Sequence, residues 1–265
     1  MPELPPSLKT VSHDLGVDTE AAYIIPLSDL HIGSEFNEDK FLGYRDWILE
    51  RPNAYCIING DVLEMATKSS IGNTYEALRP KQQKELAIKY LQPLADAGRI
   101  LAYLDGNHEH RVARETDEYP GEYICSMMGI PSVYDSDGVF LFLNVGHDRR
   151  KGEKARLTYT IFMLHGWTGS RRIGGKANNL EDMSKSVQAD IYVASHTHQK
   201  FVFPRRMVIP DSRTKSLRYI KQMFVSAGSF LEWDGYAVRK GYNPASLGSP
   251  RIRLDGTRRD FHCSI

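Results

Sequence analysis

The chain has 265 residues, of which 41% are hydrophobic, and a formal net charge of +1. This content suffices for one core, so we expect a single domain over residues 1–265, with an N-terminal arm or edge segment over residues 1–20 and a loop-rich tail over residues 228–265. No run of about 18 apolar residues occurs, which excludes a membrane-spanning helix. The proline-rich start argues against a secretion signal, and the three scattered cysteines are typical of reduced thiols, so we expect a cytoplasmic protein.

The first half of the chain alternates between apolar runs typical of strands and amphipathic stretches typical of helices. The expected strands are residues 23–27, 55–58 and 100–104, and the expected helices are residues 37–48 and 81–97. Residues 62–76 are polar and lack a clear period, which predicts a loop. The order β-α-β-α-β predicts a parallel sheet with right-handed crossovers.

The second half of the chain has more expected strands, and its pattern predicts two antiparallel hairpins. The expected hairpins are residues 139–145 with 157–164 and residues 201–209 with 217–226, the further strand is residues 191–194, and the expected helices are residues 121–128 and 174–189. The fold class we expect is α/β, or α+β-like, with two mixed β-sheets in a sandwich flanked by helices.

Five of the expected strands end in polar side chains that can bind metals. The five blocks are Asp29-Leu30-His31, Gly60-Asp61, Gly106-Asn107-His108-Glu109, His165-Gly166 and His196-Thr197-His198. Each block has an ordinary alternative, such as a turn aspartate, a capping residue or a solvated histidine. Their recurrence at five strand ends favours one common site, because α/β enzymes place their chemistry at the carboxyl ends of strands.

The blocks supply two carboxylates, four histidines and one amide, which suit a pair of divalent cations. Two such ions about 3.5–4 Å apart can clamp both the attacking and the leaving oxygen of a phosphoryl displacement. Two carboxylates offset only half of their positive charge, which leaves a positive site for a phosphate. The mixed donor set without thiolate favours Mn²⁺, with Fe or Zn²⁺ as alternatives.

The ordered pattern D-x-H, G-D, G-N-H-E, H-G and H-x-H closely resembles the calcineurin-like metallophosphoesterase family over residues 28–198. The resemblance implies a four-layer fold of two mixed sheets flanked by helices. It implies that Asp29, His31 and His198 hold one metal, that Asn107, His165 and His196 hold the second, and that Asp61 bridges them. His108 would be the catalytic histidine, protonating the leaving oxygen after attack by a hydroxide that bridges the metals.

The sequence departs from the family pattern in two places. Ser195 stands where the last block usually begins with glycine, which is tolerable if this position does not need a positive φ. Glu109 stands where aspartate is common, so its reach toward His108 would differ. Residues near the blocks that could support the site or touch substrate are Glu109, His110, Arg111, Arg171 and Arg172.

The substrate is less well defined than the chemistry. Residues 147–221 carry 16 Lys and Arg against 6 Asp and Glu. This excess of positive charge suits an anionic partner such as nucleic acid, but it is equally compatible with an ordinary solvated surface. The candidate phosphate contacts are Arg149, Arg150, Lys151, Arg171, Arg172, Lys176, Arg205 and Arg206. We expect a phosphodiesterase acting on nucleotides or nucleic-acid ends, with no membrane partner. The alternatives are a phosphomonoesterase and, more remotely, a non-catalytic phosphate-binding module.

Overall fold

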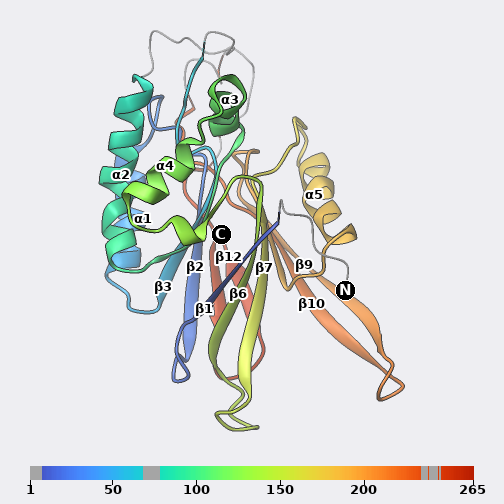
Figure 1. Cartoon of the computed structure of the whole chain (residues 1–265). Coiled ribbons are helices and arrows are strands. Elements are labelled where there is room, and N and C mark those ends of the chain that lie inside the picture. Colours follow the sequence, from blue (N-terminus) through green and yellow to red (C-terminus); the bar gives the residue numbers. More distant parts are fainter. Residues whose placement is uncertain (1–7, 68–77, 234–237, 239–243, 245) are drawn as a thin grey trace.

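The computed structural model describes residues 8–67, 78–233, 238, 244 and 246–265. Within these residues, two six-stranded sheets stack face to face, and helices cover their outer faces (Figure 1). No helix in the described ranges is both long and apolar enough to cross a membrane.

One sheet, called sheet B here, has the strand order β12-β11-β2-β3-β4-β5. Its strands are β2 (Ala21–Leu27), β3 (Ala54–Asn59), β4 (Ile100–Leu104), β5 (Tyr134–Asp135), β11 (Arg251–Asp255) and β12 (Phe261–Ser264). Strands β2 to β5 are parallel, whereas β11 is antiparallel to both β2 and β12, so the sheet is mixed.

The other sheet, called sheet A, has the strand order β1-β6-β7-β8-β10-β9. Its strands are β1 (Lys9–Asp14), β6 (Gly138–His147), β7 (Arg156–Leu164), β8 (Ile191–Ala194), β9 (Phe201–Asp211) and β10 (Ser216–Ser226). Two antiparallel hairpins, β6–β7 and β9–β10, flank the central parallel strand β8.

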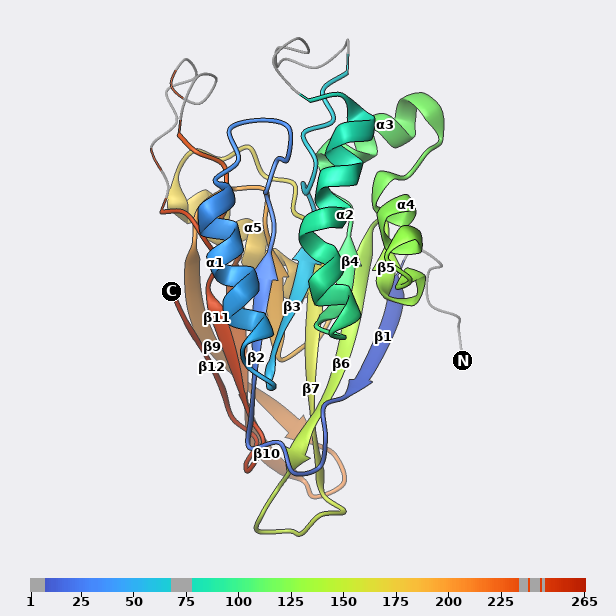
Figure 2. The ribbon, with the colours of Figure 1, turned by 90° about the vertical axis from the view of Figure 1, so that its left-hand side faces the viewer.

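Helices form the two outer layers, as the two views together show (Figures 1 and 2). Helices α1 (Glu38–Leu49), α2 (Pro80–Asp96) and α4 (Pro120–Met127) cover sheet B, α5 (Ile173–Asp182) covers sheet A, and α3 (Asn107–Thr116) follows β4 at one end of the sandwich. Short 3₁₀ turns cover Pro131–Val133 and Met183–Lys185. Helix α1 begins where the Asn37 side chain accepts a hydrogen bond from Lys40 N at 2.8 Å, which caps its first turn.

The main core lies between the sheets and beneath α1 and α2. Apart from Asn59 at the end of β3, strands β2, β3 and β4 consist of apolar and tyrosine residues, because both of their faces are covered. Ile24, Ile25 and Ile57 in these strands have no exposed surface. A second apolar cluster joins sheet A to α5 through Leu180, Tyr192 and others. Strands β2, β3, β4, β7 and β8 therefore all have their carboxyl ends on the same side of the packed core.

The expected two-sheet α/β sandwich is confirmed, and so are both hairpins and the parallel β2-β3-β4 unit. Helix α3, whose sequence lacks an apolar stripe, was not predicted. Strands β11 and β12 lie within the tail that was expected to be loop-rich. Residues 9–14 of the expected arm form β1, an edge strand parallel to β6. Part of the expected loop 62–76 lies outside the described residues.

Candidate metal centre

The polar strand ends converge at one end of the sandwich. Asp29 and His31 follow β2, Asp61 follows β3, Asn107 opens α3 after β4, His165 follows β7, and His196 and His198 follow β8. Their side chains fall into two clusters whose potential ligand atoms lie within 4.8 Å of one another. The first cluster is Asp29, His31 and His198, and the second is Asp61, His165 and His196.

In the first cluster, two imidazoles and a carboxylate point at one another. His198 Nε2 lies 3.2 Å from Asp29 Oδ1 and 3.3 Å from His31 Nε2. Asp29 is buried, and its other carboxylate oxygen accepts hydrogen bonds from Ser28 Oγ at 2.7 Å and His196 N at 3.2 Å. The carboxylate is therefore fixed by one oxygen and presents the other to the two histidines.

In the second cluster, His165 takes the central place. Its Nε2 lies 3.1 Å from Asp61 Oδ2 and 3.2 Å from Asn107 Oδ1. The His196 ring lies beside it, with ring centroids 5.4 Å apart. These contacts bring Asn107 together with the histidines to which the sequence analysis assigned it.

Asp61 connects the two clusters. Its Oδ2 lies 3.1 Å from His165 Nε2 in the second cluster and 3.9 Å from His31 Nε2 in the first. Its Oδ1 accepts a hydrogen bond from His108 N at 2.9 Å, which places the negative charge at the positive end of α3. One carboxylate oxygen thus faces histidines of both clusters.

The donor set fits bound divalent cations. Among the described residues, Asp29 Oδ1 and Asp61 Oδ2 are buried and accept no hydrogen bond. Their neighbours His198 and His165 direct ring nitrogens at them from 3.2 and 3.1 Å. Ligands about 2.0–2.2 Å from a tetrahedral cation lie roughly 3.3–3.6 Å apart, close to these separations. A cation within each cluster would satisfy every one of these atoms.

Partners behind the rings fix which nitrogen faces the clusters. His31 Nδ1 lies 3.0 Å from Glu64 Oε2, and His165 Nδ1 lies 2.8 Å from the main-chain oxygen of Asn59. A proton on each Nδ1 leaves Nε2 free to bind a metal. Glu64 was not predicted from the sequence, because only the folded chain brings a residue of the loop after β3 beside His31.

The backbone of the clusters is strained in a recurrent way. Five of the expected ligands adopt left-handed conformations, with φ of 50° at Asp29, 51° at His31, 49° at Asp61, 64° at His196 and 56° at His198. Non-glycine residues seldom occupy this region, and such outliers concentrate at functional sites. Ser195 is not among the positive-φ residues, so its departure from glycine is accommodated.

The ionisable side chains of the two clusters shift one another's pKa values strongly. Burial lowers the pKa of His31, but the hydrogen bond with Glu64 and the charge of Asp61 raise it to about 9. Burial likewise opposes protonation of His165, but Asp61 raises its pKa to about 10. Burial raises the pKa of Asp61, whereas the charge of His165 holds it well below its usual value. Without metals, the clusters therefore hold protons where cations would bind.

His108 lies beside the two clusters and belongs to neither. Together with His31 and Glu64 it forms a third group whose potential ligand atoms lie within 4.8 Å of one another. Its Nδ1 lies 2.7 Å from the main-chain oxygen of Glu64, and its ring meets that of His31 edge to face with centroids 4.6 Å apart. Burial and the positive charge of His31 lower its pKa to about 4. A proton on Nδ1 donates to Glu64, so Nε2 is the nitrogen available to a substrate.

Glu109 supports the loops rather than His108. Its buried carboxylate accepts hydrogen bonds from Gly106 N at 2.9 Å, Leu63 N at 2.8 Å and Asp61 N at 3.1 Å. Burial and the charge of Asp61 raise the pKa of Glu109 to about 7, although the hydrogen bonds from backbone amides lower it. The longer side chain expected to alter its reach toward His108 instead ties the end of β3 to the start of α3.

The four other substrate candidates differ in their exposure and contacts. His110 directs Nε2 at the main-chain oxygen of Ser136, 2.8 Å away. Arg111 is half-buried, and its charge acts on both Glu64 and His108. Arg171 and Arg172 are exposed in the loop between His165 and α5.

Most of the other basic residues do not lie near the clusters, contrary to expectation. Arg149, Arg150 and Lys151 lie in the turn before β7, whereas His165 follows the other end of this strand. Nine residues of strand, at roughly 3.3 Å each, separate the two. Arg149 and Arg150 also form ion pairs with Glu20 and Asp148.

The remaining basic candidates differ from one another. Lys176 is buried. Arg205 is bound to Glu181 with an N–O separation of 2.9 Å, and Arg206 is exposed on β9. Of the candidate arginines named from the sequence, Arg171 and Arg172 are therefore the exposed ones that stand closest in sequence to a proposed ligand.

No protein-family model and no curated protein matches the sequence. Similar solved structures include a predicted phosphoesterase from Streptococcus pneumoniae TIGR4, with 13% identity, a TM-score of 0.39 and coverage of 92% of this chain and 88% of that one. Vps29 from Entamoeba histolytica in complex with Zn²⁺ has 12% identity, a TM-score of 0.37 and coverage of 91% and 96%. A metallophosphoesterase from Sphaerobacter thermophilus has 14% identity, a TM-score of 0.37 and coverage of 91% and 87%. These likenesses are distant, so the function has to be argued from the site itself.

Proposed function

We propose that this chain is a calcineurin-like metallophosphoesterase that hydrolyses phosphodiester bonds with two divalent cations. Asp29, His31 and His198 would hold one cation, Asn107, His165 and His196 the other, and Asp61 would bind both. The observation that carries the proposal is Asp61 Oδ2, a buried oxygen without a hydrogen bond that faces histidines of both clusters.

When bound, a pair of divalent cations polarises a phosphoryl group and lowers the pKa of water. Two carboxylates, Asp29 and Asp61, offset about half of the charge of such a pair and leave a net positive site for a phosphate. Imidazole, carboxylate and amide ligands without thiolate suit Mn²⁺, Fe and Zn²⁺, of which we propose Mn²⁺.

His108 would act on the leaving group. Its Nδ1 is anchored on the carbonyl of Glu64, so the ring is oriented before substrate arrives. An anionic phosphate in contact with the ring raises the pKa of His108 because a negative neighbour favours the protonated imidazole. His108 Nε2 then holds a proton and passes it to the departing ester oxygen, a step typically worth about 10²–10⁴ in rate.

The proposed substrates are nucleotides or the ends of nucleic acids. Arg171 and Arg172 are exposed in the loop that follows the proposed ligand His165, where guanidinium groups suit the phosphates that flank a scissile bond. A strand of nucleic acid offers such phosphates, whereas a simple phosphomonoester does not.

The test combines metal analysis with paired substrates. The protein, freed of metal by a chelator and reloaded with Mn²⁺, Zn²⁺ or Fe²⁺, should bind two equivalents and hydrolyse bis-p-nitrophenyl phosphate faster than p-nitrophenyl phosphate. The opposite preference would support a phosphomonoesterase, and two bound metals without any turnover would support a phosphate-binding module. Oligonucleotide hydrolysis by wild type and by an Arg171→Ala, Arg172→Ala double variant then tests the substrate class.

A further inference from the structure

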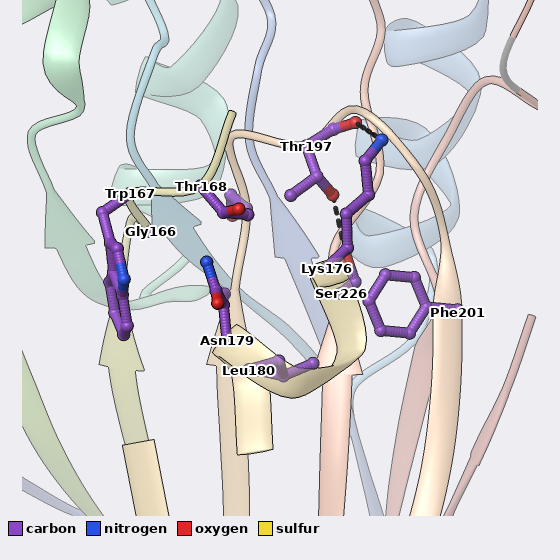
Figure 3. Close-up of a pocket in the computed structure, with 11 residues that line it drawn as sticks. Gly166, Trp167, Thr168, Lys176, Asn179, Leu180, Thr197, Phe201 and Ser226 are labelled. Carbon is purple, nitrogen blue, oxygen red and sulfur yellow. Dashed lines mark hydrogen bonds between the residues drawn. The ribbon is translucent and has the colours of Figure 1, made fainter. Parts of the chain in front are cut away.

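Lys176 is a buried cation that none of the steps above uses. It lies on α5, and only 9% of its surface is exposed. Its ammonium group donates to the main-chain oxygen of Thr197 at 3.0 Å (Figure 3). It also donates to Gln199 Oε1 at 3.0 Å. Both acceptors are neutral oxygens. Lysine is seldom buried without an anionic partner, because desolvating an ammonium group is costly, so this placement needs an explanation.

The carbonyl that Lys176 binds belongs to the peptide between two proposed ligands. Thr197 separates His196, which belongs to the second cluster, from His198, which belongs to the first. One lysine on the outer face of sheet A therefore contacts the short segment that serves both clusters.

This segment is strained and needs support from outside. His196 and His198 have φ of 64° and 56°, and Thr197 N donates to Ser195 O at 2.7 Å, which closes a tight turn around His196. Left-handed conformations of non-glycine residues cost of order 1–3 kcal/mol each and persist only where the surroundings impose them. Ser226 provides part of this support by donating to Gln199 O at 2.7 Å.

We propose that Lys176 is a positioning residue for the metal centre, which holds the Thr197 peptide so that His196 and His198 each face their own cation. The inference rests on the two-metal centre of the proposed function. Its distinctive consequence is that one substitution far from the substrate weakens both metal sites together.

A purely electrostatic role would have the opposite sign. A positive charge behind the clusters repels divalent cations, so removing it would tighten metal binding if the hydrogen bonds of Lys176 did nothing. The direction of the change therefore separates positioning from mere charge.

The experiment is a titration of metal-free full-length protein with Co²⁺, followed by visible d–d absorption, with no substrate present. Lys176→Met removes the charge and both hydrogen bonds, while the side chain keeps a similar length. It should weaken both Co²⁺ binding steps by about tenfold or more and change the spectrum at saturation, since partners outside the ligand sphere are typically worth about 10–100-fold in metal affinity. Unchanged or tighter binding would overturn the inference.

Two further variants make the result specific. Lys176→Arg retains a charged donor, and the small pocket beside Lys176, lined by Trp167, Thr168 and Asn179, offers space for the larger head group, so binding should return to near wild type (Figure 3). Lys200→Met is the matched control, because Lys200 is also partly buried and donates to a carbonyl, that of Leu247 at 3.0 Å, outside the ligand turn. Equal weakening by Lys200→Met, or no recovery in Lys176→Arg, would contradict a positioning role.

Thermal melting of each metal-free variant checks the fold. If Lys176→Met does not fold, Lys176→Gln, which keeps a polar head group, is titrated in its place and judged by the same outcomes. A wild type that binds no Co²⁺ would overturn the proposed function itself, whereas wild-type binding that Lys176→Met leaves intact would overturn only the inference about Lys176.

Discussion

Glu64 Oε2 lies 3.0 Å from Nδ1 of His31, on the side of the ring opposite to the first cluster. The hydrogen bond fixes the ring and its tautomer, so that Nε2 faces Asp29 and His198. Carboxylates that bind histidine ligands in this way raise the basicity of the ligand and are typically worth about 10–100-fold in metal affinity.

Glu64→Gln should therefore weaken metal binding by about tenfold, and Glu64→Ala should weaken it further because the ring then loses its partner altogether. Competition with a chromophoric chelator measures the affinity. Glu20→Gln is a suitable control, since Glu20 is paired with Arg149 far from the clusters. Equal affinities in Glu64→Ala and wild type would show that the hydrogen bond between His31 and Glu64 does not support metal binding.

Substitutions of His108 and of Asp61 should impair hydrolysis in different ways. His108→Ala should keep its metals and lose about 10²–10⁴ in kcat, because only proton transfer to the leaving group is removed. Asp61→Asn should lose metal occupancy first, because Asp61 Oδ2 faces both clusters. Metal analysis beside steady-state kinetics separates the two.

His147→Ala serves as the control for these variants. Its Nδ1 is bound to the main-chain oxygen of Val17 at 3.0 Å, near the turn at the other end of β6 and β7, so metal content and turnover should stay at wild-type values. Retained turnover in His108→Ala would remove His108 from the mechanism while leaving the metal assignment standing.

Metal binding should release protons and improve as the pH rises. The pKa values of His31 and His165 are raised to about 9 and about 10, so both rings are protonated at pH 7 in the metal-free protein. A metal must displace these protons. Calorimetry at pH 7 in buffers of different ionisation enthalpy should detect about two protons released per dinuclear centre. A count of zero would mean that neither ring is a ligand.

The same two groups determine how the stability of the metal-free protein depends on pH. A pKa above the ordinary 6.5 stabilises the folded state fully below that value, and the contribution is lost as the pH rises through about 9 to 10. The Tm of the metal-free protein should therefore fall between pH 7 and pH 10, whereas saturating metal should reduce this loss. A Tm that rises over this interval in the metal-free protein would contradict the assignment.

Much of the centre was predictable because its residues are local features of the sequence. An apolar run followed by Asp29 or His165 indicates a strand end with a polar side chain, and parallel strands carry such ends to one edge. The strain at these positions was not predictable, since a left-handed aspartate or histidine is imposed by the surrounding structure rather than by its own preference.

The features that were not predicted, or were misplaced, also have physical explanations. Glu64 and Lys176 act across the fold, and no spacing in the sequence indicates which side chains they meet. Arg149 was misplaced because residues before and after a strand lie at its opposite ends, although the chain reaches His165 soon afterwards. Helix α3 was missed because tertiary contacts, such as Asp61 Oδ1 with His108 N, stabilise its first turn rather than an apolar stripe.

At the metal centre, the loop after β4 approaches the loop after β3 closely at Gly106, which leads to a prediction for substitution of this glycine. A Cβ at Gly106 would overlap Asp61 Oδ1 and the Asp61 amide nitrogen. This amide donates a hydrogen bond to Glu109 Oε2, which limits how far it can move. Gly106→Ala must therefore push the proposed bridging carboxylate away, with a loss of metal occupancy and a cost of about 1–3 kcal/mol in stability. Gly43→Ala in α1 is the matched control, since a Cβ there meets nothing within 4 Å and should stabilise the helix by about 0.5–1 kcal/mol. Chemical denaturation with metal analysis would measure both, and a Gly106→Ala protein with full metal content would show that the loops can separate without disturbing Asp61.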